Sequence, residues 1–287
     1  MEKVEKCIIC KTDDLKILFK KESPIGESFT LIKCRQCGLQ FLSPRPTEEE
    51  IKKYYERKYF TRRTDRGYND YFSSSLKAEI ERVFKLNLKD LNFFDFEKGL
   101  NKDKRLLDIG CAAGYFLNYM NKRGFDVTGV DVSKCCVDFA RTSKLNVKNH
   151  DYLKIDFCKR FHLITLWATI EHLHHPQLVI KKAYQDLEDN GMLFISTCRI
   201  GGFNFMRLFG KRWRYYNFPE HLFFFSYKNL SELLRLSGFK VIRFVTYGSG
   251  IWKRGTLTKK VADFIAKKFF TGDMMLIQAK KITTEDR

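Results

Sequence analysis

The strongest constraint on the fold is a regular alternation of short apolar runs and helix-like segments that starts at Lys104. The segments with the length of strands are "RLLDI", "FDVTGVD", "NVKNHD", "FHLITLW" and "GMLFIST", and all except "NVKNHD" are rich in apolar residues. Each run has the length of a strand, and a strand that is covered by helices on both sides is apolar along its whole length. The alternation predicts an α/β fold with a doubly wound parallel sheet over residues 104–287.

Further elements are expected on either side of this alternation. Thr47 and Glu50 have the spacing of a capping box, which predicts a helix that follows Pro44 and Pro46. Apolar residues at helical spacing predict another helix over residues 76–91. Near the C-terminus we expect a helix in "SYKNLSELLRLSG", a strand in "FKVIRFVTY", a basic amphipathic segment over residues 257–270 and a last strand in "DMMLIQAKK".

Cysteine pairs near the N-terminus predict a metal site. Two C-x-x-C pairs are present, Cys7 with Cys10 and Cys34 with Cys37. Two such pairs can place four thiolates around one tetrahedral Zn²⁺, in a closed site that stabilises structure without taking part in a reaction. We therefore expect a small zinc-ribbon-like module over residues 1–42, followed by a linker with helices over residues 43–103. A redox-active cysteine pair is the alternative.

The first strand of the alternation ends in a glycine-containing turn. In "LLDIGCAAGYFL" the turn holds Gly110 and Gly114, and the next strand ends in Asp131. Ligands of an open parallel sheet bind beyond the carboxyl ends of its strands, where glycine allows close approach and an acid can bind ribose hydroxyls. The turn lacks the G-x-G-x-x-G spacing of a dinucleotide site, and Asp108 would repel phosphate but attract a positive group. These features favour a nucleoside cofactor that carries a positive charge.

The order of the motifs resembles a known family. "LLDIGCAAGYFL", "GVDVS", "FHLITLWATIEHLHHP", "LEDNGMLFIST" and "PEHLFFFS" resemble the class I S-adenosylmethionine-dependent methyltransferases, in particular small-molecule and sugar methyltransferases with an N-terminal zinc-binding segment. The resemblance implies a Rossmann-like sheet of seven strands and S-adenosylmethionine as the cofactor. It covers residues 104–281, and residues 1–60 for the zinc segment.

The resemblance also implies which residues bind the cofactor. Those expected at the methionine end and the ribose turn are Asp108, Gly110, Cys111 and Gly114. Asp131 would bind the ribose hydroxyls, Val132 would contact the adenine, Asp151 would meet the adenine amino group, and Trp167 would lie near the methionine portion. Ala112 departs from the family pattern, because many relatives have a glycine there, but the added methyl group is small.

Two histidines are candidate catalytic bases. Transfer of a methyl group from a sulfonium mainly needs alignment, but a hydroxyl or carbon acceptor must also lose a proton, and histidine is suited to accept it near neutral pH. His172 in "IEHLHHP" and His221 in "PEHLFFFS" both follow a glutamate. A packing or hydrogen-bonding role is the alternative for each. His172, His174 and His175 lack the spacing that would place them on one side of a helix as metal ligands.

A segment at residues 199–225 interrupts the sheet pattern with glycines, cations and aromatic residues. We expect this insertion to shape the substrate pocket, since inserted loops at this edge often do. Its cations would suit a phosphate-bearing acceptor, so the predicted substrate is a small molecule, such as a sugar, a glycan or a lipid-linked precursor. They are Arg207, Lys211, Arg212 and Arg214. A solvated basic face above packed aromatic residues is the alternative.

The charge of the chain leaves other partners open. The chain contains 53 Lys and Arg residues and 34 Asp and Glu residues, which gives a net charge of +19. An RNA methyltransferase is therefore an alternative, as is a non-catalytic zinc-dependent interaction protein. The basic segment at residues 253–268 could touch an anionic membrane surface. Because no apolar run is long enough to span a bilayer or to form a signal peptide, we expect a cytoplasmic protein.

Overall fold

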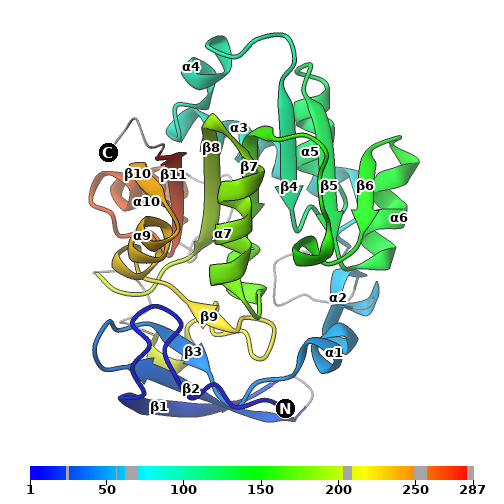
Figure 1. Ribbon diagram of the computed structural model, residues 1–287. Coiled ribbons are helices and arrows are strands. Elements are labelled where there is room, and N and C mark those ends of the chain that lie inside the picture. The colour runs from blue at the N-terminus through cyan, green and yellow to red at the C-terminus, as the bar shows by residue number, and fades with distance from the viewer. Residues whose placement is uncertain (24–25, 56, 62–69, 203–208, 249–256, 283–287) are drawn as a thin grey trace. The chain divides into compact units, whose positions relative to one another are not determined.

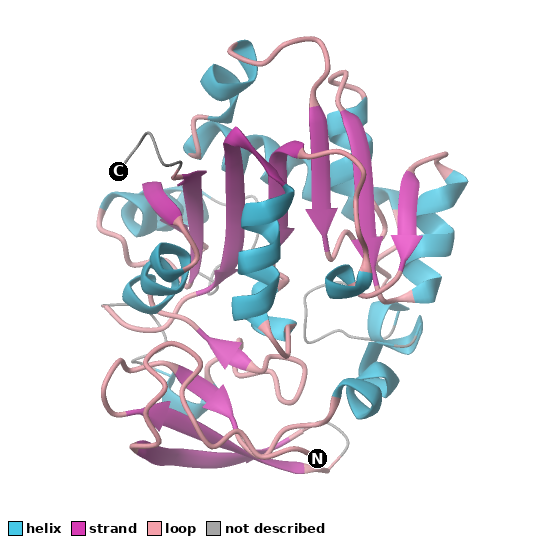
Figure 2. Cartoon of the chain, in the orientation of Figure 1, coloured by secondary structure: helices cyan, strands magenta, loops and turns pink. Residues whose placement is uncertain are grey.

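The computed structural model describes residues 1–23, 26–55, 57–61, 70–202, 209–248 and 257–282. These residues contain two sheets with helices around them (Figure 1, Figure 2). The larger sheet has seven strands in the order β10-β11-β8-β7-β4-β5-β6. The smaller sheet has four strands in the order β1-β2-β3-β9.

The seven-stranded sheet confirms the predicted fold class. Its strands are β4 (Arg105–Ile109), β5 (Asp126–Asp131), β6 (Asn146–Asn149), β7 (Phe161–Trp167), β8 (Leu187–Cys198), β10 (Phe239–Tyr247) and β11 (Met274–Lys281). Strand β4 pairs in parallel with β5 and β7, and β5 pairs in parallel with β6. The central strands are buried along most of their length, as their apolar sequences predict.

Helices precede the sheet and alternate with its strands. The helices are α1 (Glu48–Ile51), α2 (Arg57–Thr61), α3 (Ser74–Asp90), α4 (Phe93–Lys98), α5 (Tyr115–Asn121), α6 (Lys134–Thr142), α7 (Pro176–Asp186), α9 (Tyr227–Leu236) and α10 (Leu257–Lys268). The short 3₁₀ turns are η1 (Lys52–Tyr55), η3 (Tyr152–Lys154), η4 (Ile170–His172) and η5 (Gly210–Arg212). The predicted capping box is present, since Thr47 and Glu50 exchange side-chain to backbone hydrogen bonds of 2.9 and 3.2 Å.

Strand β8 begins earlier than the sequence pattern suggests. The apolar run predicts a start at Gly191, whereas the strand starts at Leu187 and includes polar residues. Two cations stabilise this polar beginning. Arg105 lies 2.9 Å from the carboxylate of Glu188, and Lys281 lies 3.1 Å from that of Asp189. Tertiary ion pairs therefore compensate for a composition that would otherwise favour a turn.

The smaller sheet joins segments far apart in the sequence. Its strands are β1 (Leu15–Glu22), β2 (Ser28–Cys34), β3 (Gln40–Leu42) and β9 (Phe223–Phe224), and all neighbours are antiparallel. Strand β9 belongs to the segment that the sequence predicts to be a substrate loop. The N-terminal residues therefore do not form their sheet alone, and a late aromatic pair completes it.

The chain divides into two compact units. One contains Met1–Ile51, Ala168–Gln177 and Ser196–Ile277, and the other contains Lys52–Trp167, Leu178–Ile195 and the residues from Gln278 onward. Each unit draws on several stretches of sequence. The domain boundaries expected near residues 42 and 103 stay predictions.

The unit that begins at Met1 has an aromatic core. The described aromatic residues of the predicted loop are mostly buried; among them are Trp213, Tyr216, Phe218, Phe223, Phe224 and Phe225. The Tyr216 hydroxyl donates to the side chain of Gln40 at 2.8 Å, and the Asn229 amide donates to the carbonyl of Cys37 at 2.8 Å. Core packing, which was the alternative interpretation, describes most of these aromatic side chains.

Candidate functional site

The turn after β4 requires its glycines. Gly110 and Gly114 have φ angles of 73° and 72°, in the left-handed region that favours glycine. A Cβ atom on Gly114 would also lie 2.8 Å from the side chain of Leu145 and 3.0 Å from that of Ala140. The turn can therefore close against helix α6 only with glycine at this position.

A carboxylate at the end of β5 fixes the same turn. The backbone N–H of Ala112 donates to one oxygen of Asp131 at 2.8 Å, and the N–H of Ser133 donates to the other oxygen at 2.8 Å. Each carboxylate oxygen has a second lone pair, so Asp131 can still accept hydrogen bonds from the hydroxyls of a ligand. The neighbouring Val132 exposes 60% of its surface, which is unusual for a valine and leaves apolar area for a ligand to cover.

Ala112 has an unusual backbone conformation for a residue other than glycine. Its φ angle is 45°, a left-handed conformation that costs a residue with a Cβ atom about 1–2 kcal/mol. The hydrogen bond to Asp131 helps to hold this conformation. Relative to glycine, alanine at this position therefore adds backbone strain.

Asp108 lies buried beneath the turn. It is 2% exposed, and the hydroxyl of Thr165 donates to its carboxyl group at 2.6 Å. Burial raises the pKa of Asp108 to about 8, and the nearby charge of Asp131 adds to the effect, while the Thr165 hydrogen bond opposes it. Burial also raises the pKa of Asp131. A positive group at this place would favour the ionised form of both carboxyls.

The thiol of Cys111 packs inward. Cys111 is buried, and a Cβ atom on Gly129 of β5 would lie 2.7 Å from its sulfur. Burial raises the pKa of Cys111 well above its usual value, so the thiol stays neutral. The predicted contact of Cys111 with a cofactor stays a prediction.

Asp151 and Trp167 have local structural partners. Asp151 caps the η3 turn, since its carboxylate accepts from the N–H of Leu153 at 3.0 Å. The ring centroid of Trp167 lies 5.0 Å from the ring centroid of Phe116 and 5.3 Å from that of Phe84. Packing therefore accounts for part of each residue's environment, and their predicted contacts with a cofactor stay predictions.

The sequence patterns did not indicate several residues that belong to this site. Thr165 orients Asp108, Ser133 orients Asp131, and Gly129 makes room for Cys111. A glycine inside a strand is a recognisable sign of close approach, so Gly129 could have been found. A cluster from the segment before α3 also packs around Ala112 and Cys136; its members are Tyr55, Tyr59, Phe60, Tyr71 and Phe72. That segment has no regular apolar period, so its sequence gives no such signal.

The two candidate bases lie together in the other unit. The rings of His172 and His221 are perpendicular, with centroids 4.7 Å apart. The Nδ1 of His172 lies 2.8 Å from the carbonyl oxygen of Glu220 and must donate to it, which leaves Nε2 as the acceptor of the neutral ring. Glu171 is 1% exposed and accepts from the hydroxyl of Thr197 at 2.8 Å. One ligand atom from each of Glu171, His172 and His221 lies within 4.8 Å of the others, so the group can share a proton or hold a cation.

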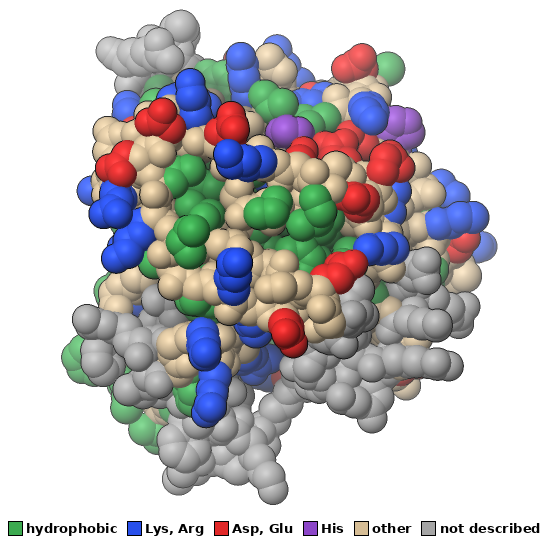
Figure 3. Space-filling model, turned by 90° about the horizontal axis from the view of Figure 1, so that it is seen from below, with side chains coloured by type: hydrophobic (Ala, Val, Ile, Leu, Met, Phe, Trp, Pro, Cys, Tyr) green, Lys and Arg blue, Asp and Glu red, His purple; other side chains and the backbone are tan. Residues whose placement is uncertain are grey.

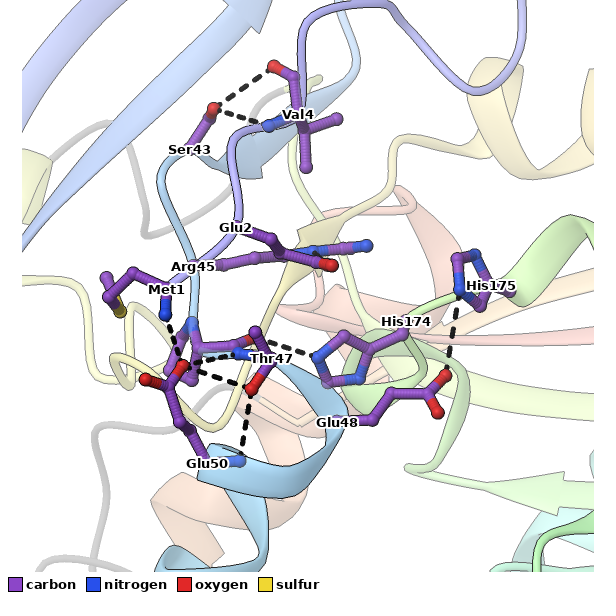
Figure 4. A network of polar contacts seen from close by, with 11 residues as sticks. Met1, Glu2, Val4, Ser43, Arg45, Thr47, Glu48, Glu50, His174 and His175 are labelled. Carbon is purple, nitrogen blue, oxygen red and sulfur yellow. Dashed lines mark hydrogen bonds and ion pairs between the residues drawn. The ribbon is translucent and has the colours of Figure 1, made fainter.

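The other two histidines of "HLHH" point elsewhere. His174 contacts the carbonyl of Pro46 through Nε2 at 2.9 Å, and His175 lies 3.6 Å from the carboxylate of Glu48 (Figure 4). Both therefore serve the network near the N-terminus, in which Arg45 binds Glu2 at 2.6 Å. The three histidines of this stretch therefore have different surroundings.

The four patterned cysteines converge. Their sulfur atoms all lie within 4.8 Å of one another, with Cys7 3.5 Å from Cys37 and Cys10 3.4 Å from Cys34. Two similar turns hold the pairs, in which the N–H of Lys11 donates to the carbonyl of Cys7 and that of Gly38 to the carbonyl of Cys34, each at 3.0 Å. Four sulfurs in such a cluster have the donor set and the spacing that a structural Zn²⁺ site needs.

Basic residues of the predicted substrate loop form no enclosed anion site in the described residues. Lys211, Arg212 and Arg214 are exposed, and Arg207 lies outside the described residues. On the face shown in Figure 3, Lys and Arg side chains alternate with Asp and Glu side chains. A phosphate-bearing substrate gains no support from this arrangement.

Comparison with known proteins identifies the family. A family model for a methyltransferase domain matches residues 79–243, which is more than half of the chain. The chain therefore belongs to the methyltransferase-domain family, and its fold is that of the class I S-adenosylmethionine-dependent methyltransferases.

Particular relatives agree with this assignment. The ubiquinone biosynthesis O-methyltransferase of Coxiella burnetii is 35% identical over 104 residues, which are 33% of this chain and 44% of that protein. The enzyme of the same name from Acinetobacter baylyi is 27% identical over 129 residues, which are 42% of this chain and 54% of that protein. The chain thus spans about half the length of these relatives.

Solved structures share the fold at low sequence identity. A SAM-dependent methyltransferase from Archaeoglobus fulgidus superposes with a TM-score of 0.53 at 20% identity, over 70% of this chain and 94% of that one. The [4+2]-cyclase SpnF superposes with a TM-score of 0.56 at 18% identity, over 84% of this chain and 98% of that one. These similarities concern the fold alone.

The pKa of Asp108 leads to a prediction about stability. Because the folded protein holds this proton up to about pH 8 while an unfolded Asp ionises near 3.8, folding loses stability as the pH rises between these values. Asp108→Asn removes this loss. We expect the variant to gain about 1–3 kcal/mol relative to the native chain between about pH 5 and pH 7, measured by urea denaturation without ligand. A stability difference that does not change with pH would show that Asp108 ionises normally.

Proposed function

We propose that the protein transfers a methyl group from S-adenosylmethionine to a small-molecule acceptor. The observation that carries the proposal is the pair of hydrogen bonds that Asp131 accepts. The backbone N–H groups of Ala112, in the turn after β4, and of Ser133 bind the two oxygens of its carboxylate. This arrangement gives a nucleoside two things at one place: a backbone that can be approached closely at Gly110, and acceptors for ribose hydroxyls.

The other predicted residues complete the proposed cofactor site. Bound S-adenosylmethionine supplies an activated methyl group on a positively charged sulfur. Asp108 would balance positive charge near the turn, and Val132 would lie against the adenine. We further propose, from the family resemblance, that Asp151 and Trp167 contact the adenine amino group and the methionine portion.

For the acceptor we propose a small molecule with a hydroxyl group. The matched relatives are named as O-methyltransferases of ubiquinone biosynthesis, which favours a small acceptor and transfer to oxygen. A sugar, a glycan or a lipid-linked precursor is the finer class that the sequence resemblance suggests. The acceptor's proton would pass to His172 or His221, whose buried carboxylate neighbours can stabilise the imidazolium.

RNA is a weaker alternative as the acceptor. The described side chains on the face of Figure 3 include both cations and acids, and the matched relatives are named for a small molecule. A protein that keeps the fold without methyl transfer is the other alternative. It would be a non-catalytic, zinc-dependent interaction protein.

The cysteine cluster supports a second proposal. We propose that Cys7, Cys10, Cys34 and Cys37 bind one structural Zn²⁺. The metal would hold the ends of the β1–β2 hairpin and the turn before β3 together, in a unit whose sheet is small. A closed four-thiolate site has no free position for a substrate, so no chemical step is assigned to it.

The cofactor proposal can be tested by calorimetry. Asp131→Ala should weaken binding of S-adenosylmethionine by about 1.5–3 kcal/mol, because hydrogen bonds to a charged group are lost. Asp126→Ala is the matched control, since Asp126 is an exposed aspartate at the other end of β5. Equal affinity in both variants would remove the ribose role of Asp131, and absence of binding to the native chain would remove the proposed function.

The histidines can be tested by the rate of methyl transfer. Production of S-adenosylhomocysteine is measured with a panel of phenols and nucleotide sugars, and the best acceptor is retained. His172→Gln or His221→Gln should lower kcat by about a hundredfold or more while leaving the affinity for the cofactor unchanged. The control is His175→Gln, an exposed neighbour. Full activity in both test variants would exclude a general base at these positions.

The zinc proposal is tested by metal analysis and thermal unfolding. We expect about one Zn per chain in the purified protein, and none after Cys34→Ser, which should also lower the melting temperature. Cys158→Ser changes an exposed cysteine outside the cluster and should change neither quantity. A metal-free native protein that melts at the same temperature would contradict a structural metal.

A further inference from the structure

The surface of helix α10 and the turn after it shows an apolar patch. It consists of Val261, Phe264, Ile265, Phe269 and Phe270, which are 51%, 63%, 44%, 63% and 48% exposed. We call these residues the α10 patch. Single exposed apolar residues are ordinary, but five large ones within ten positions indicate a surface that binds something.

The orientation of α10 is the reverse of the usual one. Its small residue Ala266 is 1% exposed and faces strand β10, where the hydroxyl of Thr246 donates to the Ala266 carbonyl at 2.6 Å. The large residues Val261, Phe264 and Ile265 lie on the solvent side. A helix that serves only to cover a sheet directs its large apolar side chains toward the sheet, so covering β10 does not explain this face.

A buried cation holds the end of the patch in place. Phe270 has a φ angle of 52°, a strained conformation for a bulky residue. The guanidinium of Arg199, which is 6% exposed, donates to the carbonyl of Phe270 at 2.6 Å and to that of Gly272 at 3.2 Å. The Phe270 ring also stacks on Phe244 at 5.4 Å. The protein therefore stabilises a backbone that presents two adjacent phenylalanines to solvent.

Positive charge lies within the patch. The ammonium of Lys268 is 5.8 Å from the ring centroids of both Phe264 and Phe269. Residues 257–270 contain four lysines and one acid, Asp263. Two of these lysines, Lys259 and Lys260, have side chains outside the described residues. The cations that precede α10 in the predicted basic segment, Lys253 and Arg254, also lie outside them.

We infer that the α10 patch inserts into the surface of an anionic membrane. An apolar protein partner would have to bury the Lys268 ammonium beside Phe264 and Phe269, which costs desolvation. At a bilayer surface the rings enter the boundary of the acyl chains while the ammonium stays hydrated beside phosphate groups. The contact is peripheral, because every helix in the described residues is too short or too polar to cross a bilayer.

Flotation with vesicles tests the inference without any methyl-transfer assay. The native chain should float with vesicles of equal parts phosphatidylcholine and phosphatidylglycerol, less so at high salt, and only weakly with phosphatidylcholine alone. Phe264→Ser combined with Phe269→Ser should reduce the partition coefficient by about tenfold or more. Lys267→Gln combined with Lys268→Gln should reduce it by about fivefold for each charge.

Two controls make the result decisive. Leu86→Ser replaces a residue of α3 that is 43% exposed and should float like the native protein, and circular dichroism confirms that the variants fold. Native protein that stays with the soluble fraction, or a double phenylalanine variant that floats normally, overturns the inference.

Light scattering tests whether a second copy of the chain covers the patch instead. A native dimer that becomes monomeric in the phenylalanine variant, with no vesicle binding, would assign the patch to self-association instead.

Discussion

The carboxylate of Asp131 accepts the N–H groups of Ala112 and Ser133, and this pair of hydrogen bonds organises the edge of the sheet where the proposed cofactor site lies. One bond fixes the turn that follows β4, and the other fixes the start of α6. Because the two strands are parallel neighbours, their carboxyl ends meet, and a single side chain can bind both connections. The left-handed conformation of Ala112 is held in the same way. A rigid turn costs less entropy when a ligand binds, so this interaction prepares the site before the ligand arrives.

Burial governs the chemistry of the ionisable groups around this interaction. Asp108 and Asp131 are held where their charges are poorly solvated, which raises both pKa values. Such a pair is unfavourable to an empty protein near neutral pH and becomes favourable when positive charge is bound between or beside the carboxyls. The arrangement is therefore compatible with a cationic ligand. This fits a sulfonium cofactor better than a pyrophosphate, which would add negative charge to the same place.

In the unit that begins at Met1, one segment contributes both to packing and to the arrangement of the candidate bases. The residues from Trp213 to Phe225 contribute buried rings, complete the small sheet through β9 and place His221 beside His172. The backbone N–H of Leu222 donates to the carbonyl of Glu171 at 2.8 Å and locks the two histidine-bearing segments together. A pair of side chains built on a packed core is positioned more accurately than one on free loops, since packing fixes the rotamers of its neighbours.

The sequence by itself determined the strands β4, β5 and β7, the glycine turn and the convergence of four cysteines. Each depends on local spacing or on the rule that parallel strands end at one edge. The long start of β8, the strained φ of Ala112, the Asp108–Thr165 hydrogen bond and the pairing of β3 with β9 came only from the tertiary structure. These features join residues far apart in the chain, where apolar periodicity carries no information about partners. Local patterns set which elements form, while packing and burial decided which side chains they bring together.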